Sequence, residues 1–258
     1  MLLAVDCGNT NIVIGVFRDD GPVANWRLAT DARRTGDEYL VILKELFGSA
    51  GLSTSDIDKM IVASVVPGVN LALEMLAKDH LHCEPVFVNY ATDTGIDICM
   101  DNPAEVGADR LVDAMAVHHA HPDTPVIVVD FGTATTFDCV SAEGAYIGGV
   151  ICPGIEISQQ ALFSHASKLS NVILHRPPRV IGKNTADGLR SGILWGYGGM
   201  VDSLVERMCL ELPDKPLVVA TGGLAPMICE YCTVVDEVDV MLTINGLKLL
   251  ADRMDSRE

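Results

Sequence analysis

The sequence VDCGNTNIVIGVF, residues 5–17, places a short polar turn between two apolar runs. Asn, Gly and Asp are ordinary turn residues between antiparallel strands, so this stretch alone predicts no more than a hairpin. A second stretch, VVDFGTATTFDCVS at residues 128–141, repeats the pattern of valine, aspartate, a glycine two residues later, small polar residues and another apolar run. The two aspartates, Asp6 and Asp130, are 130 − 6 = 124 residues apart in a chain of 258 residues. A repeat at nearly half the chain length indicates two related halves.

The composition is typical of a globular cytoplasmic enzyme with a substantial core. Apolar residues make up 49% of the chain and the formal net charge is −17, which argues against nucleic-acid partners and against anionic membrane surfaces. The sequence shows neither an apolar run of transmembrane length nor a basic signal-peptide start. Eight cysteines are scattered along the chain, and the one Cys-x-x-Cys pair, Cys229 and Cys232, lacks a second pair that would complete a zinc site. A metal or redox role for this pair stays open.

The order of predicted elements is three strands followed by alternating helices and strands, and it occurs twice. Such an order predicts an α/β protein of two similar lobes, with the boundary near residues 121–124. Strands are expected at residues 2–7, 11–17, 24–29, 59–65, 85–89, 125–130, 135–141, 145–151, 217–221 and 231–235. Helices are expected at residues 35–47, 67–81 and 102–121, after Gly154, from Thr185 to about residue 212, after Gly223 and at the C-terminus.

The two turns have the composition of a phosphate-binding site. Backbone N–H groups of a tight, glycine-rich turn can close on a phosphate, and Asn9, Thr10 and Thr133 would add side-chain donors. An aspartate at the end of the preceding strand can hold a hydrated cation. A third glycine patch at residues 220–223 would allow close approach of a flat ring or ribose, although an ordinary strand-to-helix turn explains it as well. Residues 182–185, GKNT, lack the upstream glycine of a Walker A loop.

Five stretches together carry a resemblance to a known family. They are DCGNTN at 6–11, NPAEVGADR at 102–110, DFGTATTFD at 130–138, GGVICPG at 148–154 and GKNT at 182–185. The chain resembles the superfamily of actin, sugar kinases and heat-shock chaperone ATPases, and within it the type III pantothenate kinases. The resemblance implies two ribonuclease-H-like lobes, residues 1–121 and 122–258. Each lobe would be a mixed β-sheet flanked by helices, with the nucleotide between the two.

The resemblance also implies an activity, the transfer of the γ-phosphate of ATP to the primary hydroxyl of pantothenate, the first step toward coenzyme A. It implies Mg²⁺ organised through water by Asp6, a monovalent cation (K⁺ or NH₄⁺) at Asp130, and ATP phosphate bound by Thr133. The first ATP-binding loop would consist of Asp6, Cys7, Gly8, Asn9, Thr10, Asn11, Ile12 and Val13.

The acceptor site is implied by the same resemblance. Asp109 would be the general base for the pantothenate hydroxyl, because an alcohol is a poor nucleophile until its proton has an acceptor. Substrate contacts would come from Gly107, Ala108, Asp109, Arg110 and Thr185, and from Met100, which stands where most family members have an aromatic residue. From spacing alone, Asp109 and Arg110 would be a solvated helix face shared with Asp113, and Thr185 a helix N-cap.

The resemblance further implies a homodimer. Two other functions stay open from the sequence. One is an actin-like nucleotide switch without a small-molecule acceptor, and the other is a regulatory nucleotide-binding protein. Both would leave the Asp109–Arg110 pair without an evident task.

Overall fold

The computed structural model describes residues 1–18, 21–165 and 172–256, and the chain divides into two compact units. The first unit joins residues 1–116 to the C-terminal segment that starts at Leu242, and the second comprises residues 117–241. Within the described ranges, no helix combines the length and apolar character needed to cross a membrane.

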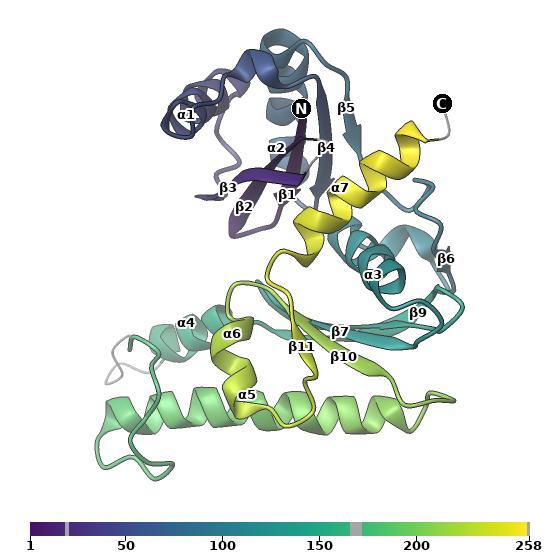
Figure 1. Cartoon of the computed structure of the whole chain (residues 1–258). Coiled ribbons are helices and arrows are strands. Elements are labelled where there is room, and N and C mark those ends of the chain that lie inside the picture. The colour runs from purple at the N-terminus through teal and green to yellow at the C-terminus, as the bar shows by residue number, and fades with distance from the viewer. Residues whose placement is uncertain (19–20, 166–171, 257–258) are drawn as a thin grey trace. The chain divides into compact units, whose positions relative to one another are not determined.

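The first unit is built on a five-stranded sheet of order β3-β2-β1-β4-β5 (Figure 1). β1 and β2 pair antiparallel, as do β2 and β3, whereas β4 runs parallel to β1 and β5 parallel to β4. The strands are β1 (Leu2–Cys7), β2 (Asn11–Arg18), β3 (Gly21–Ala29), β4 (Lys59–Ser64) and β5 (Pro85–Phe87). The helices are α1 (Gly36–Ser49), η1 (Thr54–Asp56), α2 (Pro67–Met75) with its π-helical continuation η2 (Leu76–Leu81), and α7 (Leu242–Asp255).

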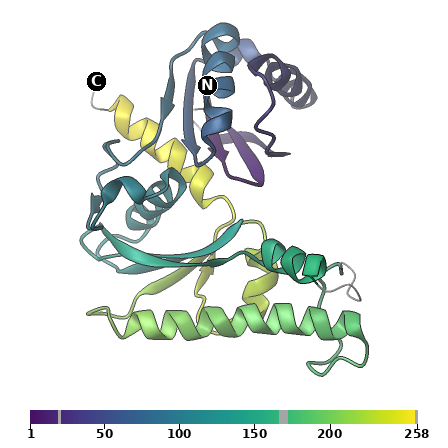
Figure 2. The same cartoon turned by 180° about the vertical axis from the view of Figure 1, so that it is seen from behind.

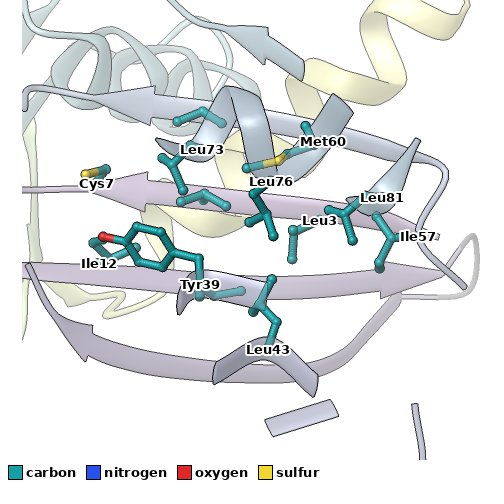
Figure 3. Close-up of a cluster of buried hydrophobic side chains, with 14 of the residues drawn as sticks. Leu3, Cys7, Ile12, Tyr39, Leu43, Ile57, Met60, Leu73, Leu76 and Leu81 are labelled. Carbon is teal, nitrogen blue, oxygen red and sulfur yellow. The ribbon is translucent and has the colours of Figure 1, made fainter. Parts of the chain in front are cut away.

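Helices α1 and α2 cover one face of this sheet. Side chains of alternate strand residues, such as Leu3 and Ile12, pack there against Tyr39 and Leu43 of α1 and Leu73 of α2 (Figure 3). Helix α1 begins at a capping box, in which Thr35 and Glu38 each accept a hydrogen bond from the other's backbone N–H.

Helix α7 packs on the opposite face of the first sheet. Gly15 of β2 alternates with the core-facing Ile14 and Val16, and a methyl group on it would overlap Ile244 of α7. Gly246 likewise lets α7 approach Val112 of α3 (Ala108–Ala120). The missing side chains at these two glycines are what allow the close packing.

The second unit repeats this topology in a sheet whose strands run β11-β10-β7-β8-β9. The strands are β7 (Val126–Phe131), β8 (Ala134–Val140), β9 (Ala145–Pro153), β10 (Leu217–Thr221) and β11 (Glu237–Val238). The helices are α4 (Ile155–His165), α5 (Thr185–Cys209), α6 (Ala225–Ile228) and η4 (Cys229–Tyr231). The long helix α5 runs along one face of the sheet and buries Leu194, Val201 and Val205 against it (Figure 2).

The two units share an α/β fold, as the internal repeat predicts. β7 has the burial pattern of β1, and each is followed by two antiparallel strands on one side and two parallel strands on the other. The sequence predicts lobes of residues 1–121 and 122–258. The compact units of the structure divide at residues 116/117, and the C-terminal segment from Leu242 joins the first unit.

Two predicted elements are wrong. The helix expected at residues 102–121 is interrupted: η3 (Pro103–Glu105) ends at Val106, whose backbone is extended, and α3 starts at Ala108. The strand expected at residues 231–235 does not form, because the backbone N–H groups of Thr233 and Val234 donate to the Asp202 carboxylate instead of to a strand. A short strand not expected from sequence, β6 (Asp97–Ile98), precedes Met100.

Candidate functional site

The first polar turn lies between β1 and β2 and is fastened to the strand beyond. The Gly8 N–H donates to the Asn11 carbonyl at 3.0 Å, which closes the turn. Thr30, just past β3, donates through Oγ1 to the Gly8 carbonyl at 2.6 Å and through its N–H to the Thr10 carbonyl at 3.0 Å. Asn9 and Thr10 are exposed at the tip. The backbone of the turn is therefore held by hydrogen bonds from its own Gly8 N–H and from Thr30, while its tip faces solvent.

Two residues of the predicted ATP loop face the core. Cys7 and Ile12 are fully buried in the hydrophobic cluster between the sheet and its helices, and burial raises the pKa of the Cys7 thiol to about 11. Asp6 and Val13, which pair across β1 and β2, are partly exposed. Any ligand contact by Cys7 or Ile12 would thus come from the backbone.

The second turn, between β7 and β8, is one residue shorter. The Gly132 N–H donates to the Ala134 carbonyl at 3.0 Å. Gly154, at the end of β9, donates its N–H to the Thr133 carbonyl at 3.1 Å, and a side chain on Gly154 would overlap that carbonyl. The backbone of Thr133, the predicted phosphate-binding residue, is accordingly held in place by Gly154 of the GGVICPG stretch.

The carboxylate of Asp130 lies between two glycines. β10 runs parallel to β7 with Thr221 opposite Asp130, and the next residue, Gly222, has a φ of +92°. A methyl group on Gly222 would overlap Asp130 Oδ1, and one on Gly132 would lie 3.1 Å from Asp130 Oδ2. The third glycine patch and the second polar turn therefore meet at this carboxylate, in a cradle that a side chain would fill.

Asp109 lies in the first turn of α3, where the helix dipole favours a carboxylate. Its Oδ1 accepts the Arg110 N–H at 2.8 Å and lies over Gly107, where a Cβ atom would be only 2.5 Å away. Gly107 is also next to Val65, whose N–H donates to the Cys7 carbonyl at 3.1 Å. Gly107 thus connects the Asp109 carboxylate, through Val65, to the end of the strand that leads into the first polar turn, within one unit.

The solvated helix face expected from spacing is absent at the described start of α3. Asp109 and Arg110 are both partly buried, Ala108 is buried, and Asp113, expected on the exposed side, is only 4% exposed.

The other two predicted contact residues lie elsewhere. Met100 is partly buried in the loop before η3, in the same unit as Asp109. Thr185 is exposed at the start of α5 in the second unit, and the N-cap of that helix is Asn184, which accepts the Asp187 N–H at 2.8 Å. The N-cap reading of Thr185 is wrong by one residue.

Sequence reasoning missed two supporting residues. Thr30 fastens the first turn, and Tyr197 of α5 places its hydroxyl 3.0 Å from the Pro153 carbonyl, 3.1 Å from the Gly154 carbonyl and 2.6 Å from Ser158 Oγ. Neither carries a local signal, because each acts across a separation in sequence that only the folded sheet and helix bring together.

The part of the chain that the structure describes holds no preassembled metal centre. Within those ranges, no three His, Cys, Asp or Glu side chains gather as a ready-made metal site. A cation at Asp6 or Asp130 would complete its shell with water, backbone carbonyls or ligand oxygens, which suits Mg²⁺ and alkali cations better than zinc.

The repeated sheet, with a glycine-rich turn after the first strand of each repeat, defines the two-lobed α/β fold of actin-like ATPases and sugar kinases. Two solved structures share it. One is a Campylobacter jejuni protein assigned to a Baf family of transcriptional activators (TM-score 0.59, 17% identity, 98% of this chain and 99% of that one). The other is a Sinorhizobium meliloti protein assigned as a 2-dehydro-3-deoxygalactonokinase (TM-score 0.58, 12% identity, 98% and 96%). At these identities the likeness shows the fold alone.

Sequence comparison narrows the class to one family. A family profile described as type III pantothenate kinase matches residues 2–207. The chain is 48% identical over 253 residues to the type III pantothenate kinase of Pelobacter propionicus, covering 98% of this chain and 99% of that protein. It is 49% identical, with the same coverage, to the type III pantothenate kinase of Anaeromyxobacter sp. strain Fw109-5. The chain belongs to the type III pantothenate kinase family.

Proposed function

We propose that the protein transfers the γ-phosphate of ATP to the primary hydroxyl of pantothenate, giving 4′-phosphopantothenate on the route to coenzyme A. Membership of the family supports the reaction. The single structural observation that carries the proposal is the Asp109 carboxylate, which accepts the Arg110 N–H and lies over Gly107. Gly107 lies next to Val65, whose N–H donates to the Cys7 carbonyl at the end of β1. A positioned base within reach of a bound phosphate is what transfer to an alcohol requires.

The two turns would hold the polyphosphate of ATP. In the first, the loop of residues 6–13 would offer the backbone N–H groups and the side chains of Asn9 and Thr10, at its exposed tip, to phosphate oxygens, while Thr30 keeps the turn in place. In the second, Thr133 would donate, supported by Gly154. The glycines at 222–223 would admit the adenosine.

Asp109 would accept the proton of the pantothenate hydroxyl as the oxygen attacks the γ-phosphorus. Most of the rate enhancement would come from positioning and charge stabilisation, as is general for phosphoryl transfer. Arg110 would stabilise the negative charge of the substrate, and Gly107, Ala108, Met100 and Thr185 would contact it.

Cations would offset the charge that ATP brings to an acidic protein. Asp6 would hold Mg²⁺ through water, and Asp130, cradled by Gly132 and Gly222, would hold K⁺ or NH₄⁺. Bound Mg²⁺ neutralises phosphate charge and fixes the phosphate geometry. We further expect a cytoplasmic homodimer.

The test is pantothenate-dependent release of ADP by the wild type and by Asp109→Asn. Asp109→Asn keeps the shape and the bond from the Arg110 N–H but cannot accept a proton, so turnover should fall by about 10²–10⁴-fold with the thermal midpoint unchanged. The matched control is Asp97→Asn, an exposed aspartate of the same unit, which should retain full activity.

An actin-like nucleotide switch is the competing function. It would hydrolyse or bind ATP at a rate indifferent to pantothenate, and Asp109→Asn would leave that rate unchanged. ATP binding without any pantothenate-dependent turnover would therefore contradict the proposed kinase activity. The protein would then share only its fold with the kinases.

A further inference from the structure

Cys229 and Cys232 lie at the two ends of a single 3-10 turn that follows α6. The Cys232 N–H donates to the Cys229 carbonyl at 3.2 Å, which closes the turn. A 3-10 helix has three residues per turn and rises about 2 Å per residue. Residues three apart, such as Cys229 and Cys232, therefore lie on the same side of the helix, roughly 6 Å apart. That separation is within the range a disulfide can span.

The two thiols contact one another unequally. The interaction between the two side chains lowers the pKa of Cys229, while the same interaction and burial raise the pKa of Cys232. The Cys232 thiol donates a hydrogen bond to the Ile228 carbonyl, at 3.4 Å. Both side chains are partly exposed. The arrangement matches that of redox-active Cys-x-x-Cys pairs, with a nucleophilic first cysteine and a protonated second one.

Helix α5 fixes this turn from two sides. Tyr231, between the two cysteines, packs edge-on against Trp195 with ring centroids 4.9 Å apart, and its backbone crosses Gly198 where no side chain would fit. Beyond Cys232, Asp202 accepts the N–H of Thr233 at 2.8 Å. Contacts from α5 therefore hold the turn that carries the two thiols.

The other cysteines of the chain have different surroundings. Cys7 and Cys139 are buried, and burial raises the pKa of their thiols to about 11 and about 12. Burial also raises the pKa of Cys83. Cys229 is the one cysteine in the described residues whose thiol pKa is shifted downward.

We propose that Cys229 and Cys232 are a redox modification site that forms a reversible intramolecular disulfide by exchange with a low-molecular-weight disulfide. The Cys229 thiolate attacks one sulfur of the disulfide RSSR, forming a mixed disulfide and releasing one thiolate RS⁻. Cys232 then loses its proton to solvent, and its sulfur attacks Cys229 Sγ, releasing the second RS⁻. Two protein thiols are oxidised and one RSSR is reduced to two thiols. This site does not depend on the proposed kinase chemistry.

The test uses the full chain equilibrated in buffers of varied reduced-to-oxidised glutathione ratio, then quenched with acid, alkylated and mapped by peptide mass. We expect loss of two free thiols and a peptide containing both cysteines that is lighter by two hydrogens, reversed by dithiothreitol. Cys232→Ser should stop at a stable single glutathione adduct on Cys229. Cys229→Ser should give neither product.

A matched control is Cys152→Ser, which removes another partly exposed cysteine of the same unit and should leave the disulfide unchanged. Circular dichroism of each variant confirms that it is folded. The proposal is overturned if both thiols stay reduced at every ratio in the folded wild type. It is equally overturned if Cys232→Ser accumulates no adduct on Cys229, or if purified protein retains zinc that protects the pair.

Discussion

Gly107 shows how a residue without a side chain shapes the chemistry of its neighbour. The Asp109 carboxylate occupies the space where a Gly107 Cβ would lie, with Oδ1 only 2.5 Å from that position. The obstacle is the end of a flexible side chain, so a methyl group would move the carboxylate and leave the backbone in place. The glycine thus serves the orientation of the Asp109 carboxylate, the proposed base, more than the stability of the fold.

Gly107→Ala should therefore lower kcat by about tenfold or more, because displacement of a positioned base weakens proton transfer. The thermal midpoint should change little. Steady-state kinetics and a thermal melt measure the two effects. Gly192→Ala is the control, since a methyl group there meets open space in α5. Equal kcat in both variants would show that Asp109 does not need this orientation.

Cys7 gives a pH prediction of definite sign. Burial raises the pKa of its thiol from 9.0 to about 11, so the folded state holds the proton more tightly than the unfolded state does. The stability that the protonated Cys7 thiol contributes to the free energy of unfolding is fully present below pH 9. It is lost as the pH rises through 11.

Urea unfolding of the wild type between pH 8 and 11 should show a steeper loss of stability than Cys7→Ala, whatever the absolute cost of the substitution. Native Cys7 should also resist alkylation at pH 8 although it adjoins the first polar turn. Parallel pH profiles of the two proteins, or rapid native alkylation, would mean that the thiol is not held protonated.

At the scale of elements, helix α7 packs the C-terminal segment of the chain onto the first sheet. Leu247 is fully buried on the sheet side of α7, and Gly15 and Gly246 admit the helix closely. Leu247→Ala should lower the free energy of unfolding by about 2–5 kcal/mol, as truncations of buried leucines do. Asn245→Ala, on the exposed side of the same helix, should cost within about 0.5 kcal/mol. Chemical denaturation measures both, and equal costs would place α7 off the sheet.

The sequence predicts best the elements whose signals are local. The strands around both polar turns, the capping box at Thr35 and the chain reversal at Asp6 and Asp130 follow from periodicity and turn composition, and the structure has them. The assignment of α7 to the first unit is not local, because the helix begins 242 − 64 = 178 residues after β4 ends and 242 − 18 = 224 residues after β2 ends. No pattern within the helix indicates the sheet on which it packs.

The errors have the same origin. Residues 231–235 have strand composition, yet the Asp202 carboxylate of α5 captures their N–H groups. The interruption of the helix at 102–121 follows from the extended Val106, which frees Gly107 to accommodate Asp109. For the site, sequence identifies Asp109, Asp130 and Thr133 as candidates, but their supports at Thr30 and Tyr197 come from tertiary contacts.

At the scale of the whole molecule, the net charge of −17 opposes any anionic substrate. Salt reduces this repulsion by general screening, since the Debye length is about 10 Å at 0.1 M ionic strength. A cation bound at Asp130 would act differently, because it would saturate and would depend on ionic size. The two effects can be separated by holding ionic strength constant and exchanging the cation.

With choline chloride replaced stepwise by KCl at fixed ionic strength, pantothenate-dependent turnover should rise and saturate. Asp130→Asn replaces the carboxylate between Gly132 and Gly222 with a neutral amide, so the half-saturating K⁺ concentration should rise by about tenfold or more while the choline baseline stays unchanged. Asp123→Asn, an exposed aspartate of the same unit, should respond to KCl as the wild type does. If choline supports turnover as well as K⁺ does, the requirement is screening of the molecule's overall charge, and the glycines around Asp130 serve only to pack β10 against β7.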